Sequence, residues 1–208
     1  MYQNIIFDLG GVVVEFAPKK YLLDLLCDAK AEAAVESIVF ESEEWKQLDL
    51  GLMTRQEANE IMLAKAREQG RAFEVQAVLD EWMRMLKPMH RTLELIRRLK
   101  KMGYKIYYLS NIAPDTLEYL QQQDFFSLFE GGVGSCQLHL AKPDPRLYKA
   151  MMMHYQLDYD ETIFIDDKKE NAQAAYTLGI TGIHYRGNAS LLKALSSCGI
   201  PIREHLLW

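Results

Sequence analysis

Short apolar runs alternate with helical patterns along most of the chain. Ile5–Phe7 is an apolar run that ends at Asp8, and comparable runs cover residues 104–109, 162–165 and 182–185. Their length and their turn-forming borders are typical of buried strands. Because each later run follows a helical pattern, the order of elements predicts an α/β fold with a parallel, doubly wound sheet.

The predicted helices carry recognisable end signals. Pro88 opens a pattern with apolar positions spaced by three, and Gly103 stands where a C-terminal cap is expected. Residues 145–155 and 171–178 show helical patterns that lead to the last two strands. Each helix therefore feeds the strand that follows it.

Residues 21–86 break this rhythm because they hold several helical patterns and no convincing strand. Thr54 and Glu57 form a capping-box pattern, in which each side chain satisfies a free backbone amide of the other residue at a helix start. That helix is expected to reach about Glu68. The segment is therefore expected to be a helical insert in the α/β domain.

Composition narrows the class of protein. The 208 residues are 49% hydrophobic and 25% charged, which suits one folded α/β domain with an insert. The net charge of −5 gives no basic surface for nucleic acid. Cys27, Cys136 and Cys198 are widely separated, so neither a disulfide framework nor a zinc site is indicated.

No run approaches the roughly 20 apolar residues that a membrane helix needs. The N-terminus also lacks the basic and apolar segments of an export signal, so a cytoplasmic location without a membrane partner is expected. The sequence does not decide between a monomer and a homodimer. It also does not decide whether residues 203–208 dock on the core or fray.

The first chemical motif is Asp8 at the end of the first strand, followed by Leu9, Gly10 and Gly11. Ligands of open parallel sheets bind outside the carboxyl ends of the strands, which is where Asp8 is placed. The glycines allow a tight turn close to a phosphate or metal. A plain turn is the alternative for this motif taken alone.

Two further motifs supply polar and cationic groups. Ser110 and Asn111 follow the second strand, where a hydroxyl and a backbone amide can donate to phosphate oxygens; a helix N-cap is the alternative. Lys142 precedes Pro143, which stiffens the backbone before a helix. Its ammonium group could serve a phosphate and a carboxylate, or it could be a solvated surface lysine.

The fourth motif is the pair Asp166 and Asp167 at the end of a strand. Adjacent carboxylates repel each other unless a cation compensates, and Mg²⁺ prefers a few carboxylates together with water and phosphate oxygens. The alternative is that Asp167 caps the next helix. The pair therefore points to a magnesium site more directly than the other motifs do.

Together and in this order, the four motifs resemble those of the haloacid dehalogenase-like superfamily, over nearly the whole chain. The resemblance implies a Rossmann-like core made of residues 1–15 and 87–208. It also implies an α-helical cap, residues 16–86, inserted after the first motif. The implied activity is that of a magnesium-dependent phosphatase acting on a small phosphorylated molecule.

The resemblance also implies site roles. Asp8 matches the nucleophile, Ser110 the phosphate-binding hydroxyl and Lys142 the lysine that screens the charges of nucleophile and phosphate. Asp167 matches a magnesium ligand, and Asp166 is expected to be a direct or a water-mediated ligand.

One position departs from the family's phosphatase pattern. Most family phosphatases carry a second acid two positions after the nucleophile, where this chain has Gly10. The Gly10 carbonyl can still bind magnesium, but it cannot move a proton. Glu15 could supply the lost carboxylate if the chain curls back, or it could be a solvated hinge residue. Asn111 and Asn171 are expected to border the site.

The expected reaction is in-line attack of Asp8 on phosphorus, followed by hydrolysis of the aspartyl-phosphate. Without a general acid, an easily departing group such as the anomeric oxygen of a sugar 1-phosphate is favoured. The whole pattern, including Asp49–Thr54 before a cap helix, is similar to bacterial phosphatases of the glucose 1-phosphate type. Trp45 and Trp82 are expected to pack in the insert or to line the substrate pocket.

Three alternatives remain open. A haloacid dehalogenase shares the fold and Asp8 but has no need for a magnesium pair such as Asp166 and Asp167. A phosphoaspartyl receiver domain carries its acid pair near the N-terminus and has no place for the inserted helices. A non-catalytic interaction or regulatory module is favoured only by Gly10.

Overall fold

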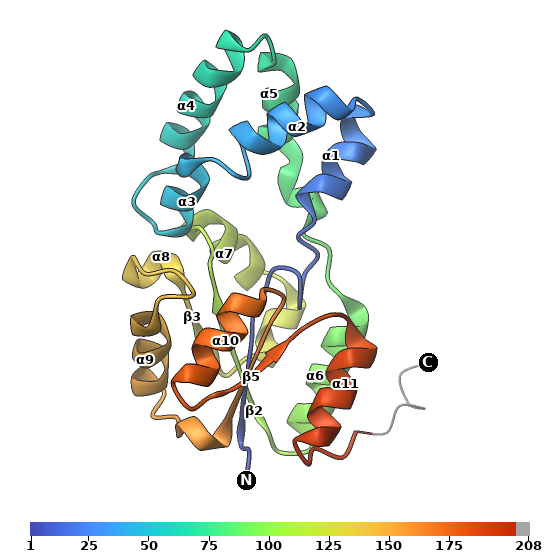
Figure 1. The fold of residues 1–208 in the computed structure, drawn as a ribbon, viewed down its shortest axis with the longest axis vertical. Coiled ribbons are helices and arrows are strands. Elements are labelled where there is room, and N and C mark those ends of the chain that lie inside the picture. The colour runs from blue at the N-terminus through green and yellow to red at the C-terminus, as the bar shows by residue number, and fades with distance from the viewer. Residues whose placement is uncertain (203–208) are drawn as a thin grey trace.

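The computed structural model describes residues 1–202; Arg203 to Trp208 lie outside the described residues. Its centre is a parallel sheet of five strands in the order β3-β2-β1-β4-β5 (Figure 1). The strands are β1 (Asn4–Phe7), β2 (Lys105–Ser110), β3 (Gly131–Gly134), β4 (Thr162–Asp166) and β5 (Thr181–His184). The predicted doubly wound α/β fold is thus confirmed.

The register of the sheet sets the place of the chemistry. Phe7 in β1 pairs with Tyr108 in β2 and with Ile165 in β4, so these three strands end at the same edge. All four residues of β1 and all five of β4 are buried, as expected for central strands covered on both faces. Residues that follow β1, β2 and β4 are therefore brought together in space.

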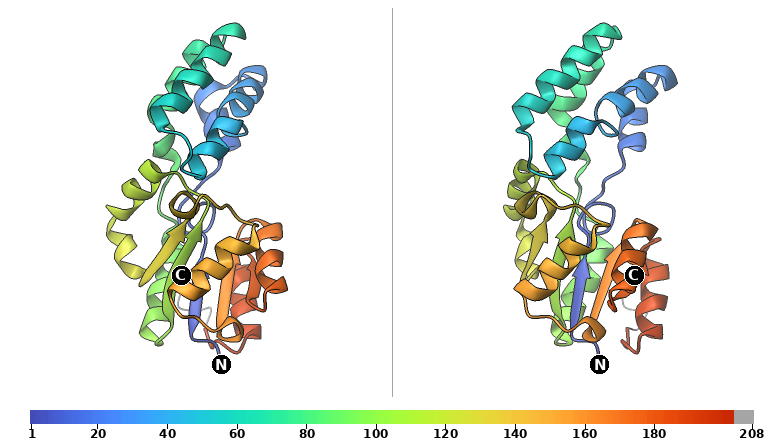
Figure 2. Two further views of the ribbon diagram at one scale, coloured as in Figure 1. Left: turned by 90° about the vertical axis from the view of Figure 1, so that its left-hand side faces the viewer. Right: turned by 60° about the vertical axis from the view of Figure 1, so that its left-hand side comes forward.

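Helices cover both faces of the sheet. Because successive strand residues point to opposite faces, Ile5 and Phe7 belong to one buried cluster and Ile6 to the other. The helices of this part are α6 (His90–Lys101), α7 (Pro114–Gln121), α8 (Ser135–Leu138), α9 (Pro145–His154), α10 (Lys169–Thr177) and α11 (Asn188–Ser197), with short 3₁₀ turns η2 (Asp124–Leu128) and η3 (Tyr159–Glu161). Clusters of apolar side chains thus hold the sheet between two helical layers (Figure 2).

The remaining helices form a separate group beyond the carboxyl edge of the sheet, which we call the helical insert (Figures 1 and 2). They are α1 (Pro18–Leu26), α2 (Ala29–Ile38), α3 (Glu43–Asp49), α4 (Arg55–Glu68), α5 (Ala72–Glu81) and the 3₁₀ turn η1 (Trp82–Met85). The chain enters and leaves the insert side by side, since the Glu15 amide donates to the Lys87 carbonyl at 2.8 Å. No helix within residues 1–202 combines the length and apolar character needed to cross a membrane.

The capping box predicted at the start of α4 is confirmed. The Glu57 amide donates to Thr54 Oγ1 at 3.2 Å, and the Thr54 amide donates to the Glu57 carboxylate at 2.9 Å. The reciprocal bonds fix the chain direction just before the longest helix of the insert. This local signal could be identified from sequence because it depends on residues only three positions apart.

Strand β3 and helix α11 were not predicted. The sequence of β3, Gly-Gly-Val-Gly, contains a single apolar side chain and therefore lacks the apolar run used to find the other strands. Its glycines have a packing reason: a Cβ on Gly132 would lie 2.4 Å from the Tyr108 carbonyl oxygen. Close approach of β3 to β2 thus requires a residue without a side chain.

We expect Gly132→Ala to lower the free energy of unfolding by about 1–3 kcal/mol, because the added methyl group must displace backbone of β2. Gly134→Ala in the same strand is the matched control. Its Cβ would meet side-chain atoms, at 3.0 Å from the ends of Ile112 and Leu117 and 3.5 Å from Cys136 Sγ. Chemical denaturation of both variants checks the difference, and equal losses would contradict the backbone clash.

Candidate active site

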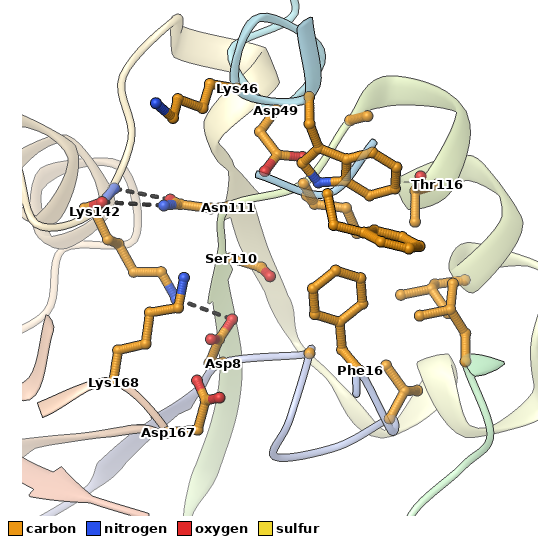
Figure 3. Close-up of a pocket in the computed structure, with 18 of the residues that line it drawn as sticks. Asp8, Phe16, Lys46, Asp49, Ser110, Asn111, Thr116, Lys142, Asp167 and Lys168 are labelled. Atoms are coloured by element: carbon orange, nitrogen blue, oxygen red, sulfur yellow. Dashed lines mark hydrogen bonds and ion pairs between the residues drawn. The ribbon is translucent and has the colours of Figure 1, made fainter. Parts of the chain in front are cut away.

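A cavity of about 310 Å³ lies between the carboxyl edge of the sheet and the helical insert. Figure 3 shows Asp8, Ser110 and Asp167 entering it from the sheet side, while Asp49 and Lys46 enter from the insert. The cavity brings together most of the residues expected in the site. These are Asp8, Gly10, Ser110, Asn111, Lys142, Asp167 and Asn171.

Asp8 stands directly after β1 and is held at one of its two oxygens. Asp8 Oδ1 accepts from the Leu9 amide at 2.8 Å and lies 2.9 Å from Lys142 Nζ. The following turn closes on itself, because the amides of Val13 and Val14 both donate to the Leu9 carbonyl. These bonds leave Oδ2 without a hydrogen bond to any other described residue.

Lys142 is buried among oxygen atoms. Its ammonium group contacts Asp8 Oδ1 at 2.9 Å, Asp166 Oδ2 at 2.7 Å and the Leu109 carbonyl at 2.8 Å, and its side chain is 1% exposed. Three acceptors match the three N–H groups of an ammonium. Burial acts to lower the pKa of Lys142, but the charges of Asp8 and Asp166 outweigh it, so the pKa is raised and the lysine stays charged.

Asn111 ties the second motif to the third. Its amide nitrogen donates to the Lys142 carbonyl at 3.0 Å, and its amide oxygen accepts from the Lys142 backbone N–H at 2.8 Å. Both ends of the amide thus hold the backbone that carries the buried ammonium. Ser110 is also buried, at the end of β2, and borders the cavity beside Asp8.

The two adjacent aspartates differ in their surroundings. Asp166 has no exposed side-chain surface, and its oxygens accept from Lys142 Nζ, from the Lys168 amide and from Asn171 Nδ2. Asp167 is partly exposed and borders the cavity. It packs against Gly11, whose φ is +74°, and a Cβ there would lie 2.5 Å from Asp167 Oδ2.

Asp8, Asp166 and Asp167 can each offer an oxygen within 4.8 Å of the others. Burial raises the pKa of Asp8 to about 6; Lys142 opposes this shift, while Asp166 and Asp167 reinforce it. The pKa of Asp167 is raised as well, first by burial and then by Asp166. A single lysine therefore does not balance this cluster, and a cation between the carboxylates would stabilise their ionised forms.

The wall opposite the carboxylates is mainly apolar and aromatic. Trp45 and Trp82 contact each other at a centroid distance of 4.9 Å, and the Arg55 guanidinium lies 5.1 Å from both rings. Both tryptophans pack within the insert and also border the cavity, so their part in a substrate pocket stays a prediction. The apolar lining residues are Val14, Phe16, Phe40, Trp45, Trp82, Leu86, Ile112, Ala113 and Leu120.

Three charged lining residues, Lys46, Asp49 and Lys168, were not assigned to the site from the sequence. Lys168 follows the acid pair, and Asp49 ends helix α3 of the insert. Burial raises the pKa of Asp49 to about 7, against the opposing charges of Arg55 and Lys168. Glu15, the acid considered as a substitute at the first motif, is exposed and is absent from the cavity lining.

Comparison with known proteins identifies relatives across most of the chain. A sesquiterpene phosphatase from Aspergillus oryzae is 28% identical over 198 residues, covering 95% of this chain and 93% of that protein. A D-ribitol-5-phosphate phosphatase from Bacteroides thetaiotaomicron is 25% identical over 192 residues, covering 86% of this chain and 89% of that protein.

Among solved structures, a wild-type HAD family enzyme from B. thetaiotaomicron, in complex with magnesium and inorganic phosphate, superposes with a TM-score of 0.67. It is 24% identical and the match covers 92% of this chain and 99% of that one, which supports the shared fold. The family model for haloacid dehalogenase-like hydrolases matches residues 2–179. With its sheet order and strand-end motifs, the chain therefore belongs to the haloacid dehalogenase-like hydrolases.

Proposed function

We propose that this protein is a magnesium-dependent phosphatase that hydrolyses a small phosphate monoester through an aspartyl-phosphate on Asp8. The observation that carries the proposal is the Asp8 carboxylate, fixed at Oδ1 by Leu9 and Lys142. Its other oxygen is left to act as the nucleophile at the base of a cavity large enough for an organic phosphate.

The donors beside Asp8 fit magnesium. Carboxylate oxygens of Asp8 and Asp167 with the Gly10 carbonyl would form the small set of hard oxygen ligands that Mg²⁺ prefers, with water and phosphate oxygens completing the set. Asp166 is better suited to a water-mediated contact because both its oxygens already accept hydrogen bonds. When bound, the metal would offset the negative charge of the transferring phosphoryl group.

Four side chains of the protein have further roles in the proposed reaction. Lys142 keeps Asp8 ionised and oriented through a direct contact, so that the carboxylate oxygen can attack phosphorus while the ester P–O bond breaks. The Ser110 hydroxyl is placed to donate to a phosphate oxygen, and Lys168 brings a second cation to the cavity. Asn111 supports the site by fixing the backbone of Lys142.

Two substrate classes have separate support. The sequence favours a sugar phosphate, and one relative acts on ribitol 5-phosphate by its name. The apolar wall favours an ester whose organic group is a hydrocarbon or an aromatic ring, and another relative is a sesquiterpene phosphatase. We favour the apolar ester, because burying apolar surface against this wall contributes about 25 cal/mol per Å².

Asp8→Asn is expected to lower kcat for phosphate release by about 10⁴-fold or more, since the amide oxygen is a poor nucleophile. EDTA should abolish the activity of the unaltered protein, and Mg²⁺ should restore it. Asp24 is exposed, and Asp24→Asn removes the same charge as Asp8→Asn, so this variant is the control. Phosphate release from a panel of esters is the measurement.

An unaltered protein that releases no phosphate from any ester would support the non-catalytic module. Halide release from 2-haloacids that persists in EDTA would support the dehalogenase. Phosphate release that survives Asp8→Asn would exclude the nucleophile proposed here.

For the substrate class, we expect kcat/KM for farnesyl monophosphate to exceed that for glucose 1-phosphate by about tenfold or more. Phe16→Ala should lower the farnesyl value by about 10- to 100-fold, the effect of losing one buried aromatic contact, and the sugar value by less than about threefold. Steady-state kinetics of both esters test this. Equal or faster turnover of glucose 1-phosphate would favour the sugar class.

A further inference from the structure

We propose that Asp49 of the helical insert is the acid–base residue that position 10 lacks. Its carboxyl group would protonate the departing oxygen and then accept a proton from the attacking water. This inference rests on the proposed phosphatase function and adds a catalytic residue to it.

The composition of the cavity leaves few other candidates. Within the described part of the chain, no Glu, His, Cys or Tyr lines the cavity, and Gly10 has no side chain. In the proposed function, Asp8 is the nucleophile and Asp167 is a ligand of the metal. The Lys142 ammonium is engaged by three acceptors and its pKa is raised, so it is a poor proton donor. Asp49 is the remaining carboxyl group.

The position of Asp49 suits both proton transfers. In phosphoryl transfer the attacking and leaving oxygens lie roughly in line on opposite sides of phosphorus. Asp8 approaches from the sheet, and Asp49 enters the cavity from the insert (Figure 3). The water that hydrolyses the phosphoenzyme must attack from the side that the leaving group has vacated. One carboxyl group on that side can therefore serve both steps.

The backbone around Asp49 is held against the core by contacts on three successive residues. The Ser135 hydroxyl donates to the Asp49 carbonyl, and His139 Nδ1 lies 2.7 Å from the Leu50 carbonyl. Gly51 has a φ of +65°, and a Cβ there would lie 2.7 Å from the Cys136 carbonyl oxygen. These contacts place the end of α3 over the nucleophile.

Arg55, at the start of α4, makes a second tie between the insert and the core. Arg55 donates to Asp115 through Nε at 2.8 Å and through a terminal nitrogen at 3.1 Å, a bidentate pair between the insert and α7. The Asp49 carboxyl group itself has no hydrogen-bond partner within residues 1–202. It is therefore positioned by its backbone while its oxygens remain available to a substrate.

The charge state of Asp49 also suits the role. Its pKa of about 7 results first from burial; Arg55 and Lys168 act to lower it, and Asp8 and Asp115 act to raise it. Lys46 also borders the cavity from the same helix. Near neutral pH both the acid and the carboxylate are populated, which is the condition under which one group works as acid and then as base.

Asp49 gives up one proton and regains one in each catalytic cycle. An Asp8 oxygen bonds to phosphorus, the ester P–O bond breaks, and the leaving oxygen takes the Asp49 proton to become an alcohol. Water then bonds to phosphorus and gives a proton to the Asp49 carboxylate as the P–O bond to Asp8 breaks. Phosphate departs with Asp8 ionised and Asp49 protonated again. With this residue, the absence of an acid at Gly10 no longer restricts the substrate to easily departing groups.

The test compares two esters of similar shape, para-nitrophenyl phosphate with a good leaving group and para-nitrobenzyl phosphate with a poor one. In Asp49→Asn, kcat/KM for the benzyl ester should fall about 10²–10⁴-fold, the usual contribution of general acid–base catalysis. The phenyl ester should keep kcat/KM within about threefold. In the unaltered protein, kcat/KM for the benzyl ester should fall above about pH 7 because Asp49 loses its proton. This fall should be absent in Asp49→Asn.

A second readout isolates the base step. Asp49→Asn should release one equivalent of nitrophenolate in a burst, followed by slow turnover, with phosphoenzyme detected by intact mass. Glu43→Gln, an exposed acid on the same helix, is the matched control and should behave like the unaltered protein. A thermal melt of each variant checks folding.

Equal losses of kcat/KM on both esters without a burst, or no loss on the benzyl ester, would overturn the assignment of Asp49. An unaltered protein without phosphatase activity would instead overturn the proposed function itself. The two failures are therefore separated by the activity measured before any substitution.

Discussion

The contact of the Lys142 ammonium with Asp8, Asp166 and the Leu109 carbonyl is the interaction on which the rest of the site depends. It joins three strand ends, because Asp8 follows β1, Leu109 lies in β2 and Asp166 ends β4. An uncompensated charge is costly to bury, and here the buried ammonium is matched by two carboxylates and a carbonyl oxygen. Asn111 and Asn171 complete the arrangement by fixing the lysine backbone and the Asp166 carboxylate. The Asp8 carboxylate is thereby held in place by the protein itself.

The insert supplies what the sheet edge lacks. The sheet edge carries most of the charged and polar lining residues, whereas Phe16 and the tryptophans of α3 and η1 provide aromatic surface and Asp49 provides a further carboxyl group. Arg55 connects the two bodies, since it lies over Trp45 and Trp82 and also pairs with Asp115 of α7. The same aromatic pair therefore lines the cavity and contacts the arginine that ties the insert to the core.

Much of this could be predicted from sequence because parallel strands end at a common edge. Asp8, Ser110 and Asp167 each stand at the end of a recognisable strand, and Lys142 precedes a proline-marked helix start. The cavity brings these distant residues together. Asp49 could not be assigned in the same way. Its side chain reaches the site because the end of α3 packs against Ser135 and Cys136, which lie more than 80 positions later in the chain. Strand β3 was not predicted for a different reason. Its close packing against Tyr108 requires glycine, so the strand lacks the apolar run that marks the other strands.

The sheet and the insert line different parts of the cavity, and this difference affects which positions of the chain can change. The buried lysine and its acceptors depend on one another, so a change at any of them disturbs the others. The aromatic lining residues, which are Phe16, Phe40, Trp45 and Trp82, are held by contacts within residues 16–86 and by a small number of contacts between the insert and the core. Substitutions there can change the shape and polarity of the cavity while the contacts of Lys142 with Asp8 and Asp166 are preserved. The core thus carries the charged groups that tolerate substitution least, and the insert carries the aromatic residues at which substitution is tolerated best.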